Sequence, residues 1–195
     1  MKTRVFAVMI AMLTGGCGSV AFNSQFPQAP QAVAAAGSPA LGLATVRDTR
    51  TSTTLGKIGV ATVVSGPELD DYLYHSLSAA LVQKGFAVQN APDPGTGSSA
   101  GFNAKIVQVT VQSASLHTFD AIMAPAQVTL VIAIQVCDPT GKVLYSQTYQ
   151  SDTKDYIGMH SQAGYETRTG EVLSQAVTQA VNAAMADQQL LAALK

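Results

Sequence analysis

The sequence predicts an α+β domain, in which a mixed or mainly antiparallel sheet of about five to six strands packs against two helices on one face. Three segments alternate apolar and polar residues, as strands with one buried face do: residues 104–113, 126–137 and 142–150. Two further segments repeat apolar residues at intervals of three and four, which is typical of amphipathic helices: residues 65–84 and 170–194. The single domain is expected to cover residues 41–195.

The first half of the domain supplies two strands and one helix. Short apolar runs at 41–46 and 56–64 predict the strands. Ser65, with Pro67 and Glu68 after it, matches the pattern of a capping box at a helix N-terminus. Lys84 followed by Gly85 is typical of a helix C-terminus.

The second half is rich in strands and ends in a helix. Residues 86–88 predict a short strand, and residues 91–101 a loop rich in Gly, Pro and Ser. The turn at 138–141 is so short that the strands on either side of it must pair antiparallel. Residues 156–169 are expected to form a loop, and the helix 170–194 is expected to break near Asp187.

The first 17 residues carry the features of an export signal. Two basic residues precede an uncharged apolar run at 5–13, and small residues follow it, so residues 1–16 are predicted to be a signal peptide. Residues 13–17 resemble a lipobox, with Thr14 where the pattern usually has Leu, so Cys17 is the predicted lipidation site. The alternative is an ordinary signal peptide cut elsewhere, with Cys17 a plain thiol. Gly18 after the cysteine favours the outer membrane, facing the periplasm, over the inner membrane.

Residues 18–40 contain no charged residue and show no helical or strand period. With lipidated Cys17 they are predicted to form a flexible tether, 17–40, between the membrane and the domain. Such a tether extends to at most about 75 Å and typically spans about 25–30 Å. The alternative is that part of it lies on the domain, with Phe22 and Phe26 as the contacts.

The composition argues against a nucleic-acid partner and limits the possible states of the second cysteine. The formal net charge is −1 and only 12% of residues are charged, which gives no basic surface for nucleic acid. The second cysteine, Cys137, has no intramolecular partner if Cys17 carries lipid. It is therefore expected to be a buried thiol or to form an intermolecular bond.

Several segments together resemble the YajG family of bacterial lipoproteins. They are the lipobox-like start, the step Asp48-Thr49-Arg50, the turn Gly56–Gly59, the step Gly85-Phe86-Ala87-Val88, the alternating strands and the Ala-rich final helix. The resemblance covers most of residues 41–195 and implies an envelope lipoprotein without enzymatic activity. Similar small lipoproteins serve in envelope transport and secretion assemblies, some of them as oligomeric rings.

The histidines are the only candidates for catalysis. His75 lies four residues after Asp71, a spacing more typical of a solvated helical pair than of a metal site. His117 and His160 fall in expected connections, and a hydrolase using them is the minor alternative. No metalloprotease, CxxC, nucleophile-elbow or phosphate-loop motif occurs, so no catalytic site, metal or cofactor is expected.

Asp48 and Arg50 are the remaining candidate site. They are expected to form a local ion pair that holds the corner after the first strand, worth at most about 1 kcal/mol if exposed. The alternative is a partner-binding surface that includes Arg47. The sequence therefore predicts a membrane-anchored, non-catalytic periplasmic lipoprotein that binds an envelope partner, either protein or cell wall. The alternative is an oligomeric component of an envelope export assembly.

Overall fold

The computed structural model describes residues 21–58, 61–94, 102–118, 125–157 and 161–195. Within these ranges the fold is α+β and contains three helices and two sheets. The larger, mixed sheet contains, in spatial order, β6 (Ala87–Ala91), β2 (Ala40–Ala44), β7 (Ile106–Thr118), β8 (Pro125–Cys137) and β9 (Val143–Tyr156), with β3 (Arg47–Asp48) beside β7. The smaller sheet contains β1 (Ala21–Asn23), β5 (Ala61–Val64) and β4 (Thr54–Ile58) in that order.

The strand directions follow from the connections. β2 is parallel to β6 and to β7, and the chain between β2 and β6 passes through the smaller sheet and α2 (Pro67–Gln83). Parallel strands need a long crossover of this kind, which usually includes a helix. β7 and β8 are antiparallel. β8 and β9 are also antiparallel, as the short turn at Asp138–Gly141 between them requires. All three long strands predicted from alternation are therefore present.

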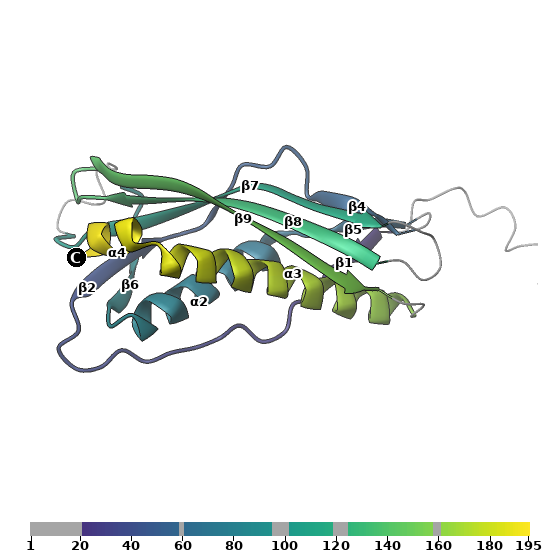
Figure 1. Cartoon of the computed structure of the whole chain (residues 1–195), viewed down its shortest axis with the longest axis horizontal. Coiled ribbons are helices and arrows are strands. Elements are labelled where there is room, and N and C mark those ends of the chain that lie inside the picture. The colour runs from purple at the N-terminus through teal and green to yellow at the C-terminus, as the bar shows by residue number, and fades with distance from the viewer. Residues whose placement is uncertain (1–20, 59–60, 95–101, 119–124, 158–160) are drawn as a thin grey trace, which may run out of the picture.

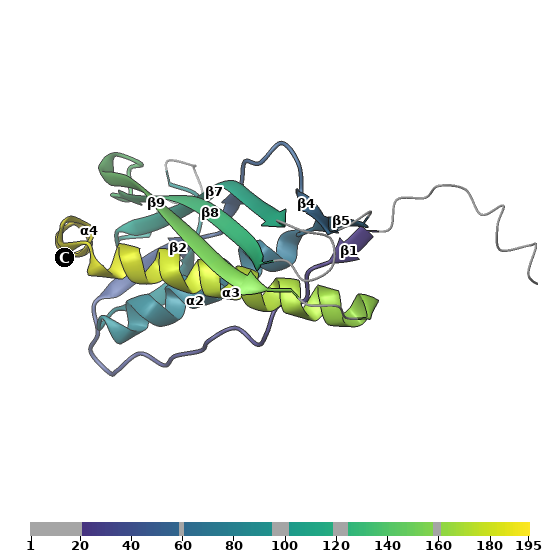
Figure 2. The same ribbon diagram turned by 45° about the vertical axis from the view of Figure 1, so that its right-hand side comes forward.

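The core lies between the larger sheet and the helices α2 and α3 (Gln162–Ala186), which cover one face of it (Figures 1 and 2). Alternate residues of β8 point into this core with no exposed surface: Val128, Leu130, Ile132, Ile134 and Val136. Each such side chain contributes about 1.5–3 kcal/mol relative to an exposed one. The opposite face of β8 carries half-buried residues such as Gln127 and Thr129. The predicted arrangement of two helices on one face is confirmed.

The predicted loop at 156–169 is wrong, because β9 continues to Tyr156 and α3 begins at Gln162. Ser161 caps this helix: its side chain accepts a hydrogen bond from the backbone N–H of Gly164. Gly170, the predicted start of the helix, lies two turns inside α3 and is buried. A Cβ atom at this position would overlap the backbone of Gln25. The glycine therefore allows the N-terminal segment to pack directly on the helix.

Residues 21–26 are part of the fold, so the predicted flexible tether at 17–40 is wrong for these residues. β1 pairs in parallel with β5, and Phe22 stacks on Tyr165 of α3 with ring centroids 5.4 Å apart. Phe26 contacts Tyr72 of α2, with ring centroids 5.2 Å apart. These are the two aromatic contacts that the alternative interpretation of residues 18–40 expected.

The ends of the helices agree only partly with the sequence. The N-cap of α2 is Gly66 and has no side-chain cap, so the capping box between Ser65 and Glu68 is wrong. Ser65 is instead buried, and its backbone N–H donates to the carbonyl of Thr53. At the other end, Gly85 has φ +95°, as the predicted C-terminus requires. The predicted break at Asp187 is confirmed, since this residue separates α3 from α4 (Gln188–Leu194).

Candidate functional site

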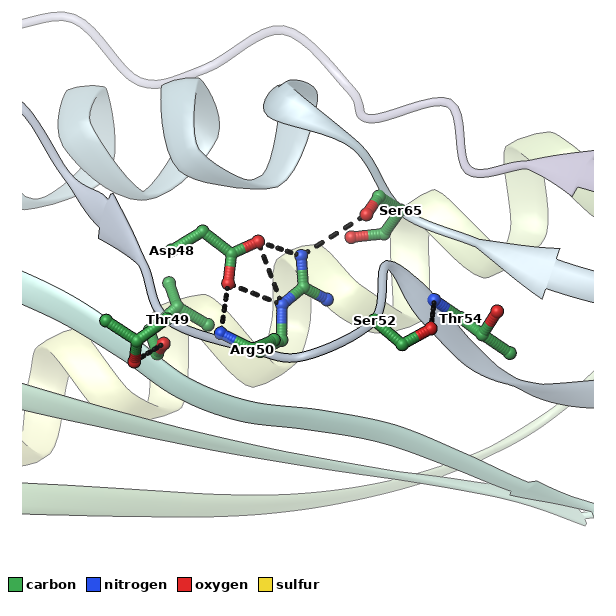
Figure 3. Close-up of polar contacts among 7 residues, drawn as sticks. Asp48, Thr49, Arg50, Ser52, Thr54 and Ser65 are labelled. Atoms are coloured by element: carbon green, nitrogen blue, oxygen red, sulfur yellow. Dashed lines mark hydrogen bonds and ion pairs between the residues drawn. The ribbon is translucent and has the colours of Figure 1, made fainter.

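The corner after β3 brings Asp48 and Arg50 together. β3 is held beside β7, and the backbone N–H of Thr49 donates to the carbonyl of Val111 at 3.0 Å. The chain then turns so that the Arg50 guanidinium binds both carboxylate oxygens of Asp48, with N–O distances of 2.6 to 3.0 Å (Figure 3). The Arg50 backbone N–H also donates to Asp48 at 3.0 Å. This fork geometry is the strongest form of a charge-assisted hydrogen bond.

The Arg50 side chain is buried, so the pair is not a fully exposed one. Only 4% of the Arg50 side chain and 22% of the Asp48 side chain is accessible. The guanidinium also donates to the carbonyl of Ser65 at 3.2 Å, which joins this corner to the start of α2. Hydrogen bonds from Arg50 hold the pKa of Asp48 below its ordinary value. The contacts therefore connect β3 to α2 through one buried cation.

Asp70, in the first turn of α2, is the residue that sequence reasoning missed. Its pKa is raised to about 6, first because burial penalises the charged carboxylate and second because of the nearby charge of Asp48. One of its oxygens is buried and has no hydrogen-bond partner among the described residues, and the same holds for Arg50 Nη1 and Ser65 Oγ. Residue spacing could not identify Asp70, because its burial depends on the corner around Arg50, which lies 20 residues earlier in the sequence.

A cleft of about 260 Å³ opens beside Asp70, between α2 and the chain that follows β2. Its lining residues are Thr45, Val46, Asp70, Asp71, Tyr74, His75 and Asn90. The volume is below the usual range of small-molecule sites, about 300–1,000 Å³. Its lining can exchange protons and accept hydrogen bonds, but it contains no cysteine or lysine. Of its two hydroxyl groups, Thr45 is exposed, and burial raises the pKa of Tyr74, which disfavours the nucleophilic phenolate.

The structure does not bring the candidate catalytic histidines together in the part of the chain that it describes. His75 is exposed and packs edge-on against Tyr74, and Asp71 lines the same cleft. His117 is exposed near the end of β7, whereas His160 lies outside the described residues. Across the described ranges, no group of three or more His, Cys, Asp or Glu side chains could hold a metal ion.

Cys137 ends β8 and is a buried thiol, with only 2% of its surface exposed. Burial, together with the charge of Asp138, raises the pKa of the thiol. A thiol with these properties is unreactive toward disulfide exchange. The expectation of a buried thiol is therefore confirmed for this cysteine.

The second candidate surface is the outer edge of β9, the last strand of the larger sheet. β9 pairs with β8 on one side, and no other described strand pairs with it on the other. Its first eight residues, 143–150, carry no charge, and Val143 and Leu144 are 49% and 44% exposed. Exposed edges are usually protected by charges or bulges, because their free N–H and C=O groups can pair with another chain. The register of β9 with β8 shifts once, between Val143 and Tyr145, and is regular from Tyr145 onward.

These features define a small α+β domain with a two-helix layer, a buried ionic corner and a long open edge strand. The sequence matches no protein-family model and no curated protein. No helix in the described ranges has both the length and the apolar character needed to cross a membrane.

Solved structures with a similar fold exist at low sequence identity. An uncharacterized protein is 16% identical, with a TM-score of 0.51, and the similarity covers 86% of this chain and 97% of that one. A Xanthomonas campestris protein of the DUF330 family is 13% identical, with a TM-score of 0.49 and coverages of 86% and 95%. The Neisseria meningitidis lipoprotein GNA1162 is 13% identical, with a TM-score of 0.44 and coverages of 74% and 99%. At these identities the similarity describes the fold alone.

Proposed function

We propose that this protein is a non-catalytic lipoprotein of the bacterial cell envelope, anchored through lipid on Cys17 after removal of residues 1–16. The basic, apolar and small-residue order of the first 17 residues supports this anchoring. Gly18 supports the outer membrane, with the domain in the periplasm. The absence of a catalytic motif from the sequence supports a binding role.

The binding partner is a protein of the envelope, and it pairs with the open edge of β9. The observation that carries this proposal is the uncharged stretch at 143–150 on an edge strand of 14 residues. Strand addition to such an edge supplies affinity through backbone hydrogen bonds. The exposed side chains of Val143 and Leu144 add apolar surface at its start. The Asp48–Arg50 corner serves as a structural link, because its guanidinium is buried.

Photo-crosslinking in living cells tests the edge directly. A photoreactive amino acid replaces Leu144 in one variant and Gln83 in the other. Gln83 is the matched control because it is exposed on α2, which packs beside β6 at the opposite edge of the sheet from β9. We expect a reproducible crosslinked protein with the label at Leu144 and none with it at Gln83. The proposal fails if the Leu144 label gives no product or if both labels capture the same protein. A protein that co-sediments with isolated cell wall without any crosslink would instead identify the cell wall as the partner.

An oligomeric component of an export assembly is the second candidate function. The same edge favours it, because two copies of β9 can pair with each other in an antiparallel ladder. In that case the Leu144 label captures a second copy of this chain, and native mass spectrometry shows an oligomer. A strict monomer across micromolar concentrations rules this function out.

A further inference from the structure

We infer that the end of the domain at which β1 begins lies against the lipid bilayer, so that β9 points away from the membrane with its residues 143–150 at the far end. This inference rests on the proposed lipid anchor at Cys17. Its physical basis is the distance between that cysteine and the first residue fixed in the fold. Only Gly18, Ser19 and Val20 separate Cys17 from Ala21 in the sequence. Four residue steps span at most about 14 Å.

β1 fixes the point from which this short connection starts. Ala21 pairs with Thr62 of β5, and the backbone N–H of Ser24 donates to the carbonyl of Val64 at 3.1 Å. Phe22 is buried beneath Tyr165, and the backbone N–H of Gln25 donates to Glu166 at 2.9 Å. Because these contacts join β1 to both the smaller sheet and α3, the anchor holds the whole domain and not a loose arm.

Several strands end beside the start of β1, and together they form what we call the proximal end (Figure 1). Ile58 pairs with Ala61 where β4 turns into β5, close to Ala21 in the register of the smaller sheet. The Thr118 hydroxyl, at the end of β7, donates to the carbonyl of Lys57 at 3.0 Å. In the larger sheet, the first residue of β8 pairs with the last residue of β9, Tyr156. The described proximal end therefore includes Lys57, Ile58, Thr118, Pro125 and Tyr156.

The chemistry of the proximal end suits a headgroup surface. Tyr156 is 65% exposed, and aromatic rings with a polar tip favour the interface between lipid and water. Lys57 and Lys154 are exposed at the same end of the domain, and lysines are attracted to lipid headgroups that carry negative charge. The neighbouring acids Asp155 and Glu171 share one cation, Arg168, at 2.7 and 2.6 Å, so this cluster keeps a single net negative charge beside the two exposed lysines. A lipid bilayer is the occupant that the exposed tyrosine and the lysines fit.

The opposite end of β9 is correspondingly far from the membrane. Leu144 lies 12 residues before Tyr156 on the same strand, which corresponds to about 40 Å at the usual rise per residue. The turn at Asp138–Gly141 lies beyond Leu144 at this end, as do α4 and the C-terminus (Figure 1). The uncharged edge proposed for partner binding is thereby held toward the interior of the periplasm.

Depth-dependent fluorescence quenching of the full lipidated protein tests this orientation. In a Cys137→Ala background, Tyr156→Cys and Leu144→Cys variants carry an environment-sensitive fluorophore. Both positions are exposed, and the Arg168 contact to residue 156 uses its backbone carbonyl, which the substitution keeps. The variants are reconstituted into phosphatidylethanolamine–phosphatidylglycerol vesicles that contain lipids with a nitroxide headgroup.

We expect emission from position 156 to fall about twofold or more, because the label reaches the headgroup layer, and emission from position 144 to stay unchanged. Equal quenching at both positions, or stronger quenching at 144, overturns the orientation if mass spectrometry of the same sample shows an acylated Cys17. A mature N-terminus without lipid overturns the proposed anchor and the orientation together. The two failures are therefore distinguishable in one preparation.

Discussion

Replacing Asp70 with Asn is predicted to stabilise the protein at neutral pH and to have little effect in acid. The folded-state pKa of Asp70 is about 6, raised from an ordinary value of 3.8 chiefly by burial. An acid with a raised pKa stabilises the fold only while it is protonated. Its contribution is therefore complete below about pH 4 and is lost as the pH rises through about 6. Asn is neutral at every pH and has nearly the same shape, so it avoids this loss.

The size of the effect follows from the shift of about two pKa units. Each unit corresponds to about 1.4 kcal/mol, giving about 3 kcal/mol as an upper value. Asp70 is only half-buried, and solvent screening reduces this to about 1–2 kcal/mol. Asn also loses the favourable interaction of the Asp70 charge with the helix dipole, which lowers the expected gain in stability by at least about 0.3 kcal/mol. We therefore expect Asp70→Asn to raise the free energy of unfolding by about 1 kcal/mol at pH 7.5.

Urea unfolding of a soluble form starting at Gly18 measures this difference at pH 7.5 and at pH 4.5. Asp71→Asn is the matched control, because it removes the same charge from an exposed neighbour and should change stability by less than about 0.5 kcal/mol. The reasoning is refuted if Asp70→Asn changes the free energy of unfolding equally at both pH values. It is also refuted if this variant is the less stable protein at pH 7.5.

Two further predictions concern contacts that close the fold. Gly170→Ala should lower the free energy of unfolding by about 2 kcal/mol, because the new methyl group meets the backbone of Gln25. This loss exceeds the gain from the higher helix propensity of alanine. The control Gln179→Ala, on the same helix, should leave urea unfolding unchanged. Asp187→Ala should reduce the hydrogen-exchange protection of α4 about fivefold to tenfold, as loss of an N-cap does. It also removes the acceptor of the Tyr145 and Tyr149 hydroxyls. Unchanged exchange in α4 would contradict this role.

The sequence predicted those helices and strands in which buried residues recur at a regular interval. β8 is the clearest case, since every second residue from Val128 to Val136 faces the core. α3 was found only from Gly170 onward, because the apolar stripe is regular there and the first turns depend on other contacts. Those turns are stabilised by Ser161 at the cap and by Phe22, which is more than 100 residues away in the sequence. Such long-range contacts leave no periodic signal.

The candidate site also has one feature that the sequence could predict and others that it could not. Asp48 and Arg50 are two residues apart on one short turn, so their pairing could be expected from spacing alone. Their burial could not, because it comes from the approach of α2, whose Ser65 carbonyl receives the guanidinium. The raised pKa of Asp70 depends on the same approach. Residue spacing alone therefore predicted the Asp48–Arg50 contact. Its burial and the raised pKa of Asp70 could be derived only from the folded structure.

The N-terminal segment shows how one contact changes a functional expectation. Low charge and three prolines favoured a flexible linker with a typical span of about 25–30 Å. Two aromatic residues in that segment, Phe22 and Phe26, are each packed against a tyrosine on a helix. Their burial brings the first fixed residue to within about 14 Å of the proposed lipid. A domain anchored this closely cannot search a wide volume, so the proposed function requires the partner to reach the exposed edge of β9.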